Sequence, residues 1–89
     1  MNIEKIVAQL KKDANLTEVC HKTTFTGYRE DKNGDNQEIE VDILDAGPNR
    51  PEYRYICIAR SEDGKMATGN PDFSIEMAIL GVHWINLDK

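Results

Sequence analysis

The sequence predicts a small α+β domain with the element order α-β-β-β-α, in which a three-stranded antiparallel sheet carries two helices packed on one face. Three observations predict this fold class. The chain opens with helical periodicity, alternates with a period of two through its middle, and returns to helical spacing near its C-terminal end. Because a chain of 89 residues buries one modest core, we expect a single domain over residues 1–89.

The first element is predicted to be an amphipathic helix over residues 2–13. Asn2 is placed to cap its N-terminus, and Lys11 and Lys12 fall in the last turn, where the helix dipole favours positive charge. Its apolar side chains recur at the i, i+3, i+4 and i+7 spacing of one helix face and are Ile3, Ile6, Val7 and Leu10.

Three strands are predicted in the middle of the chain. Residues 24–29 are rich in β-branched and aromatic side chains, residues 38–43 alternate acidic with aliphatic side chains, and residues 53–60 form the third strand. The Asn-Gly pair at residues 33–34 predicts a tight hairpin between the first two strands, because such a turn requires positive φ angles. A turn at residues 62–65 ends the third strand.

The inward face of the third strand is open to two interpretations. In the first, Ile56 and Ile58 lie on the outer face and form a small partner-binding patch opposite the acidic side chains of the second strand. The inward residues are then Ile39, Val41, Ile43, Tyr53, Tyr55 and Cys57. In the second interpretation the two faces are reversed, and Ile56 and Ile58 belong to the core.

The last third of the chain is predicted to form a second helix that begins at Asn70-Pro71-Asp72, an N-cap followed by a proline and an acid in the first turn. Its core-facing stripe is expected to be Phe73, Met77, Leu80, Trp84 and Leu87. Gly81 costs about 1 kcal/mol relative to alanine inside a helix. Two outcomes follow, a helix that continues to Leu87, which we favour, or a helix that stops at Gly81.

This element order resembles that of a double-stranded RNA-binding domain. The motifs that carry the resemblance are the Gly-Pro turn at residues 47–48, the aromatic opening of the third strand at Tyr53 or Tyr55, and, loosely, the turn at residues 67–70. Aligning Ser74 with the serine that opens the family's second helix matches three further positions, Ala78, Val82 and Leu87. The resemblance covers most of the chain and implies that family's fold.

The lysines with which this family contacts RNA are absent here. With Ser74 in register, their positions hold Ile75, Glu76 and Ile79. Arg50 lies close to the place of the family's histidine after the Gly-Pro turn. A net charge of −5 opposes binding to a phosphate backbone, which depends on clustered cations.

Ile75, Ile79 and Val82 recur at i, i+4 and i+7 and form a second apolar stripe, offset from the predicted core stripe. Either the sheet and the first helix wrap far enough to cover this stripe, or it binds a protein partner, most simply a second copy in a homodimer. The predicted function is therefore a non-catalytic interaction module that mediates protein–protein contact or homodimerisation. The alternative is a weak duplex-RNA-binding protein that uses Gln9, Lys12 and Arg50.

No cofactor, metal site or catalytic site is predicted. Residues 31–37 place oxygen ligands as the start of an EF-hand loop does, but Asn36 stands where the invariant glycine belongs, so we expect a polar hairpin loop. The spacing of Cys20, His21 and His83 does not favour a metal site. The sequence contains no nucleophile elbow, phosphate loop or dinucleotide fingerprint, which indicates a protein that is not an enzyme.

We also expect a cytoplasmic protein. The apolar run at residues 77–80 is far shorter than the roughly 20 residues of a membrane span, and the first residues lack the pattern of a signal peptide. Two cysteines are too few for a disulfide scaffold, and Cys57 is expected to be a small buried apolar residue.

Overall fold

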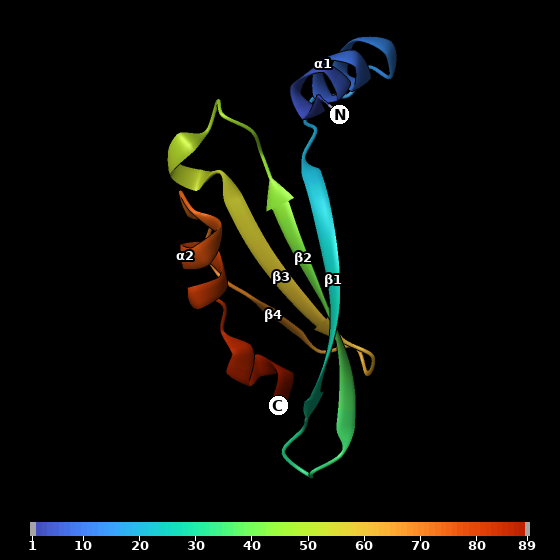
Figure 1. Cartoon of the computed structure of the whole chain (residues 1–89), viewed down its shortest axis with the longest axis vertical. Coiled ribbons are helices and arrows are strands. Elements are labelled where there is room, and N and C mark those ends of the chain that lie inside the picture. The colour runs from blue at the N-terminus through green and yellow to red at the C-terminus, as the bar shows by residue number, and fades with distance from the viewer. Residues whose placement is uncertain (1, 89) are drawn as a thin grey trace.

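The computed structural model describes residues 2–88 and has an α+β fold, which confirms the predicted class. Four strands form one antiparallel sheet in the order β1-β2-β3-β4, so each strand pairs with the strand that follows it in the chain (Figure 1). The elements are α1 (Ile3–Asp13), β1 (His21–Glu30), β2 (Asn36–Asp45), the 3-10 turn η1 (Pro51–Tyr53), β3 (Tyr55–Ser61), β4 (Met66–Thr68), α2 (Ile75–Leu80) and the 3-10 turn η2 (Trp84–Asp88).

The prediction of a three-stranded sheet is wrong, because a fourth strand completes the sheet. β4 has three residues and pairs antiparallel with β3, with Ala67 opposite Ala59. An alternation this short does not distinguish a strand from a turn, and the sequence pattern placed the segment in the turn before the last helix. β3 begins at Tyr55, because Tyr53 belongs to η1.

Two hairpins of the sheet close through the same kind of five-residue turn. In each, the first residue donates its N–H to the carbonyl of the fifth, at 2.8 Å in residues 31–35 and 2.9 Å in residues 61–65. The fourth residue is a glycine with a positive φ, 82° at Gly34 and 88° at Gly64. The predicted Asn-Gly hairpin is confirmed, although only its glycine takes the positive φ.

The core lies between β3 and β4 and the C-terminal segment that covers them. α2 and η2 pack on these two strands and define what we call the inner face of the sheet. Its buried apolar residues are Ile39, Cys57, Ala59, Ala67, Ala78, Val82 and Leu87. Because Cys57 and Ile39 face inward, the first assignment of the faces of β3 is confirmed, and Ile56 and Ile58 lie half-buried on the outer face. Tyr53 is an exception, because it lies exposed in η1, and a partner-binding role of Ile56 and Ile58 stays a prediction.

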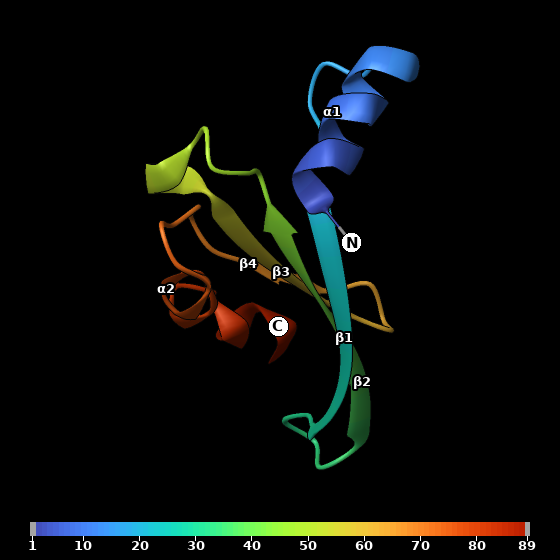
Figure 2. The same ribbon diagram turned by 45° about the horizontal axis from the view of Figure 1, so that its top comes forward.

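α1 does not pack on the inner face beside α2, so the prediction of two helices on one face is wrong. The helix itself is confirmed, and its cap is in place, with Lys5 N–H donating to Asn2 Oδ1 at 3.1 Å. Yet none of its residues is buried, and it lies across the end of the sheet, well away from α2 (Figures 1 and 2). Helical periodicity predicts an apolar face but does not say which surface covers it.

α2 is shorter than predicted and shows a different face to the sheet. Its cap is Ser74, whose Oγ accepts from Met77 N–H at 3.1 Å, and it ends at Leu80, so the continuation to Leu87 is wrong. Asn70 does not cap it, because Asp72 is held extended by two 2.9 Å backbone hydrogen bonds to Tyr55. Within residues 2–88, no helix has the length and apolar character needed to cross a bilayer.

The predicted core stripe of α2 is wrong as well. Phe73 and Leu80 are 66% and 74% exposed, whereas Ala78 is buried against the sheet. Of the five predicted stripe residues only Leu87 is buried, from its place in η2. Small residues on both sides allow this close approach, since Ala78 meets Ala59 and Ala67 in the core.

Candidate functional site

The first candidate site is an apolar surface on α2 and its N-terminal flank, directed away from the core. Ile75 and Ile79, two of the three predicted partner-binding residues, are 38% and 37% exposed. Val82, the third, is 5% exposed and belongs to the core, so it is not available to a partner. We call the exposed set the α2 patch, and its members are Phe73, Ile75, Met77, Ile79 and Leu80.

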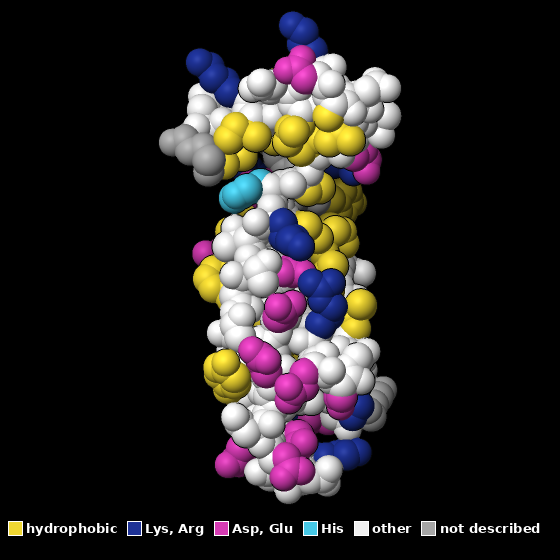
Figure 3. Space-filling view, turned by 90° about the vertical axis from the view of Figure 1, so that its right-hand side faces the viewer, with side chains coloured by type: hydrophobic (Ala, Val, Ile, Leu, Met, Phe, Trp, Pro, Cys, Tyr) yellow, Lys and Arg dark blue, Asp and Glu magenta, His cyan; other side chains and the backbone are white. Residues whose placement is uncertain are grey.

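A second apolar surface is the stripe along α1. Ile6 and Leu10 are each 39% exposed, and Ile3 and Val7 are half-buried. We call these four residues the α1 stripe. Figure 3 shows apolar side chains gathered in a band along the α1 end of the molecule, beneath lysines that project outward. An amphipathic helix in a compact domain buries such a stripe, and this one covers no core.

The inner face of the sheet is itself only partly covered. Over β1 and the adjoining side of β2, Phe25 is 55% exposed and Gly27 has open space around its Cα. The strand register places these residues on the same face as Val41 and Ile39, which contact the core. We call this region the open half, and it consists of Thr23, Phe25, Gly27, Val41 and Ile43.

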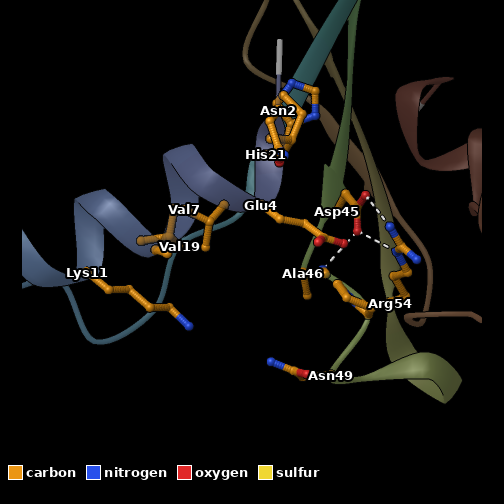
Figure 4. A pocket seen from close by; sticks show the side chains of 14 residues that line it. Asn2, Glu4, Val7, Lys11, Val19, His21, Asp45, Ala46, Asn49 and Arg54 are labelled. Carbon is orange, nitrogen blue, oxygen red and sulfur yellow. Dashed lines mark hydrogen bonds and ion pairs between the residues drawn. The ribbon is translucent and has the colours of Figure 1, made fainter.

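A cleft of about 910 Å³ separates α1 from the loop after β2 (Figure 4). Ile3, Val7 and Val19 contribute apolar lining, and polar lining comes from Glu4, Lys11, His21, Asp45 and Arg54, among others. Arg54 donates to both carboxylate oxygens of Asp45, at 2.7 and 3.1 Å, and Gly47 N–H donates to Asp45 Oδ1 at 2.8 Å.

Two of the charged side chains that line this cleft, Asp45 and Arg54, are paired with each other. The side-chain hydrogen bond from Arg54, opposed in part by burial and helped by Gly47 N–H, lowers the pKa of Asp45 below its ordinary value. The same pair raises the pKa of Arg54. No hydroxyl or thiol side chain occurs among the described lining residues.

The predicted RNA-binding residues do not form one cationic surface. Gln9 and Lys12 are exposed on α1, whereas Arg50 lies before η1 and pairs with Glu18 at 2.8 Å. The other three arginines are also paired with carboxylates: Arg29 with Asp88, Arg54 with Asp45 and Arg60 with Asp42. An arginine already held by a carboxylate must break that pair to bind a phosphate.

The residues weighed for metal binding are not arranged as a site. In the hairpin loop Asp31 Oδ1 accepts from the N–H groups of Asn33 and Asp35, both at 2.9 Å, so this carboxylate serves the turn. Among residues 2–88, no three His, Cys, Asp or Glu side chains gather closely enough to hold an ion. Cys20 is exposed, and Cys57 is buried as predicted, with a thiol pKa raised by burial.

The sequence analysis did not predict that Phe25 is exposed, or which face of α2 packs on the sheet. The alternation of β1 assigns Phe25 to one face but contains no signal that this part of the face lacks a cover. No protein-family model matches the chain, and neither does any curated protein or solved structure compared with it. The resemblance to a double-stranded RNA-binding domain therefore stays a prediction.

Proposed function

We propose that this protein is a non-catalytic interaction module of the cytoplasm that binds another protein chain, most simply a second copy, through apolar side chains that its own fold leaves uncovered. The observation that carries the proposal is the α2 patch. Five apolar side chains share a short helix and its flank, and each is more than a third exposed. Contiguous exposed apolar surface on a small protein marks an interaction site.

The charge pattern supports a protein partner over duplex RNA. All four arginines are held by carboxylates, and the net charge is −5. From residue 66 to residue 88 there is no lysine or arginine at all. The α2 patch therefore combines apolar surface with negative charge, which repels a phosphate backbone.

The test is sedimentation velocity over a wide range of protein concentration. The mass of the wild-type chain is expected to rise above 10.1 kDa with concentration. Ile79→Glu places a charge in the α2 patch and is expected to remove the association that depends on this patch. Asn70→Glu adds the same charge to an exposed polar position outside the patch and serves as the matched control, with wild-type association.

Two results would contradict the proposal. One is a chain that stays monomeric at every concentration. The other is a saturable, salt-sensitive shift on titration with a duplex RNA of about 16 base pairs at low ionic strength, which would favour the RNA-binding alternative.

A further inference from the structure

The open half of the inner face has room for one more helix. α2 and η2 lie over β3 and β4, and among the described residues no helix lies over β1. Phe25, at the centre of β1, is 55% exposed, and a Cβ added at Gly27 would meet nothing within 4 Å. Phe25 lies between Thr23 and Gly27 on this face, and an exposed phenylalanine on a sheet face is the kind of anchor that a packed helix covers.

The α1 stripe is an apolar helix face that its own chain covers only in part. α1 lies beyond the end of the sheet (Figures 1 and 2). Ile6 and Leu10 are each 39% exposed on it, and Leu16, in the segment that follows, is 44% exposed. Ile3 and Val7, on the adjoining side of the helix, line the cleft against the loop after β2. The helix thus rests on its own chain along one edge and presents the rest of its stripe outward.

The surface area of the chain is that of a subunit and exceeds that of a compact monomer. Its accessible surface is 6484 Å². A compact monomer of this mass exposes roughly 5,300 Å², which leaves an excess of roughly 1,200 Å². A standard protein–protein interface buries about 800 Å² on each partner. The radius of gyration, 15.2 Å, likewise exceeds the roughly 12 Å of a compact chain of this length.

Charge indicates how two copies align. α1 carries Lys5, Lys11 and Lys12 against Glu4 and Asp13, a net charge of +1, at one end of a molecule 48 Å long. The β1–β2 hairpin at the other end, residues 28–38, has four acidic residues against two cations: Glu30, Asp31, Asp35 and Glu38 against Arg29 and Lys32. Figure 3 shows this separation, with acidic side chains gathered toward the end opposite α1. An antiparallel pair places each lysine-bearing end beside the partner's acidic end.

We propose that the α1 stripe of one copy packs into the open half of a second copy, and the reverse, in an antiparallel two-fold dimer. The contact is isologous, because the same two surfaces meet twice. This inference goes beyond the proposed function, because the contact it names uses the α1 stripe and the open half and leaves the α2 patch free for a further contact. Ile79→Glu is therefore expected to leave the contact between Leu10 and Phe25 intact. These two residues lie at the centre of the proposed dimer contact.

The experiment mixes equal amounts of ¹³C-labelled and unlabelled chain and records isotope-filtered NOE spectra. Contacts between Leu10 methyl protons of one copy and Phe25 ring protons of the other are expected. Two variants test the same contact by sedimentation. Phe25→Ala and Leu10→Lys are each expected to raise the dimer dissociation constant about tenfold or more, as truncation of an interface anchor does.

Each variant has a matched control that keeps the dimer. Tyr28→Ala removes an exposed aromatic of the same strand from the opposite face, where it lies across from Glu38. Gln9→Lys adds the same charge to α1 next to the stripe. Circular dichroism checks that all four variants fold, so that a loss of association reports on the contact.

Two outcomes overturn the inference and separate it from the proposed function. A dimer without these interchain contacts, unchanged by Phe25→Ala and Leu10→Lys, overturns the α1 docking alone. A monomer at every concentration, with the Leu10–Phe25 contact inside one chain, shows that α1 folds back on its own sheet and overturns both proposals.

Discussion

At the scale of single residues, the backbone of Gly69 comes close to that of Gly81. A Cβ built on Gly69 would lie 2.5 Å from the Gly81 carbonyl oxygen and 3.0 Å from Val82 N. Nearby, His83 N–H donates to Thr68 O at 3.3 Å, which joins β4 to the segment after α2. Only a residue without a side chain fits there, because backbone cannot move aside as a flexible side chain does.

Gly69→Ala is therefore expected to lower the free energy of unfolding by about 1–3 kcal/mol, the usual cost of overpacking a core. Urea denaturation followed by circular dichroism measures this change. Gly27→Ala is the matched control, since the added Cβ meets nothing within 4 Å. An equal loss of stability in both variants would contradict the close approach.

The Asp45–Arg54 pair predicts how stability depends on pH. The pKa of Asp45 is lower in the folded protein than its ordinary value of 3.8, chiefly because Arg54 donates to it. The carboxylate thus contributes stability that is present above the unfolded pKa and is lost as the pH falls through the folded value. Asp45→Asn is expected to be less stable than wild type at pH 7, with the difference shrinking below about pH 4.

Chemical denaturation of both proteins between pH 7 and pH 2.5 measures this difference. Glu52→Gln, in the exposed turn η1, is the control and is expected to follow the wild-type curve. A gap between wild type and Asp45→Asn that stays constant across the whole range would show that the carboxylate charge contributes nothing.

At the scale of elements, α2 begins at a different residue from the one that the local capping pattern predicts. Ser74 caps the helix, although Asn70-Pro71-Asp72 has the stronger local pattern. Ser74→Ala is expected to lower the free energy of unfolding by about 1 kcal/mol, the typical value of an N-cap. Asn70→Ala is expected to leave it unchanged, and thermal melts compare the two. The reverse ranking would place the cap at Asn70.

Patterns of neighbouring residues correctly predicted two elements, α1 and the β1–β2 hairpin. The capped amphipathic α1 and the β1–β2 hairpin with its glycine turn follow from a few adjacent residues each. The faces of α2 do not, because alanines and glycines, which have weak apolar signals, form its contact with the sheet. Periodicity therefore assigned Phe73 and Leu80 to the core, where larger side chains usually lie.

The candidate site was predictable only in part for the same reason. Ile75 and Ile79 were predicted from an apolar stripe and are exposed on α2, while Val82 of that stripe is in the core. Phe25 was not predicted, because whether a strand face is covered depends on where a distant helix lies. The placement of α1 decides whether Phe25 is covered, and no pattern of neighbouring residues predicts that placement.

At the scale of the whole molecule, the separation of charge between the two ends predicts salt-dependent association. Lysines of α1 and acidic residues of the β1–β2 hairpin attract across an antiparallel pair, and added salt screens that attraction. The dimer dissociation constant is expected to rise several-fold between about 0.05 M and 0.5 M NaCl. Sedimentation at both salt concentrations measures it. Tighter association at high salt would indicate a purely apolar interface.

The strand order β1-β2-β3-β4 has a consequence for how the chain folds. Each strand finds its partner in the segment just made, and two of the three connections are five-residue turns. α2 and η2 then pack on β3 and β4, which precede them in the chain. Pairing between neighbouring segments favours folding from the turns outward, because a short turn loses little loop entropy before each pairing is gained. The sheet and its cover can thus assemble in the order of synthesis, from the N-terminal hairpin onward.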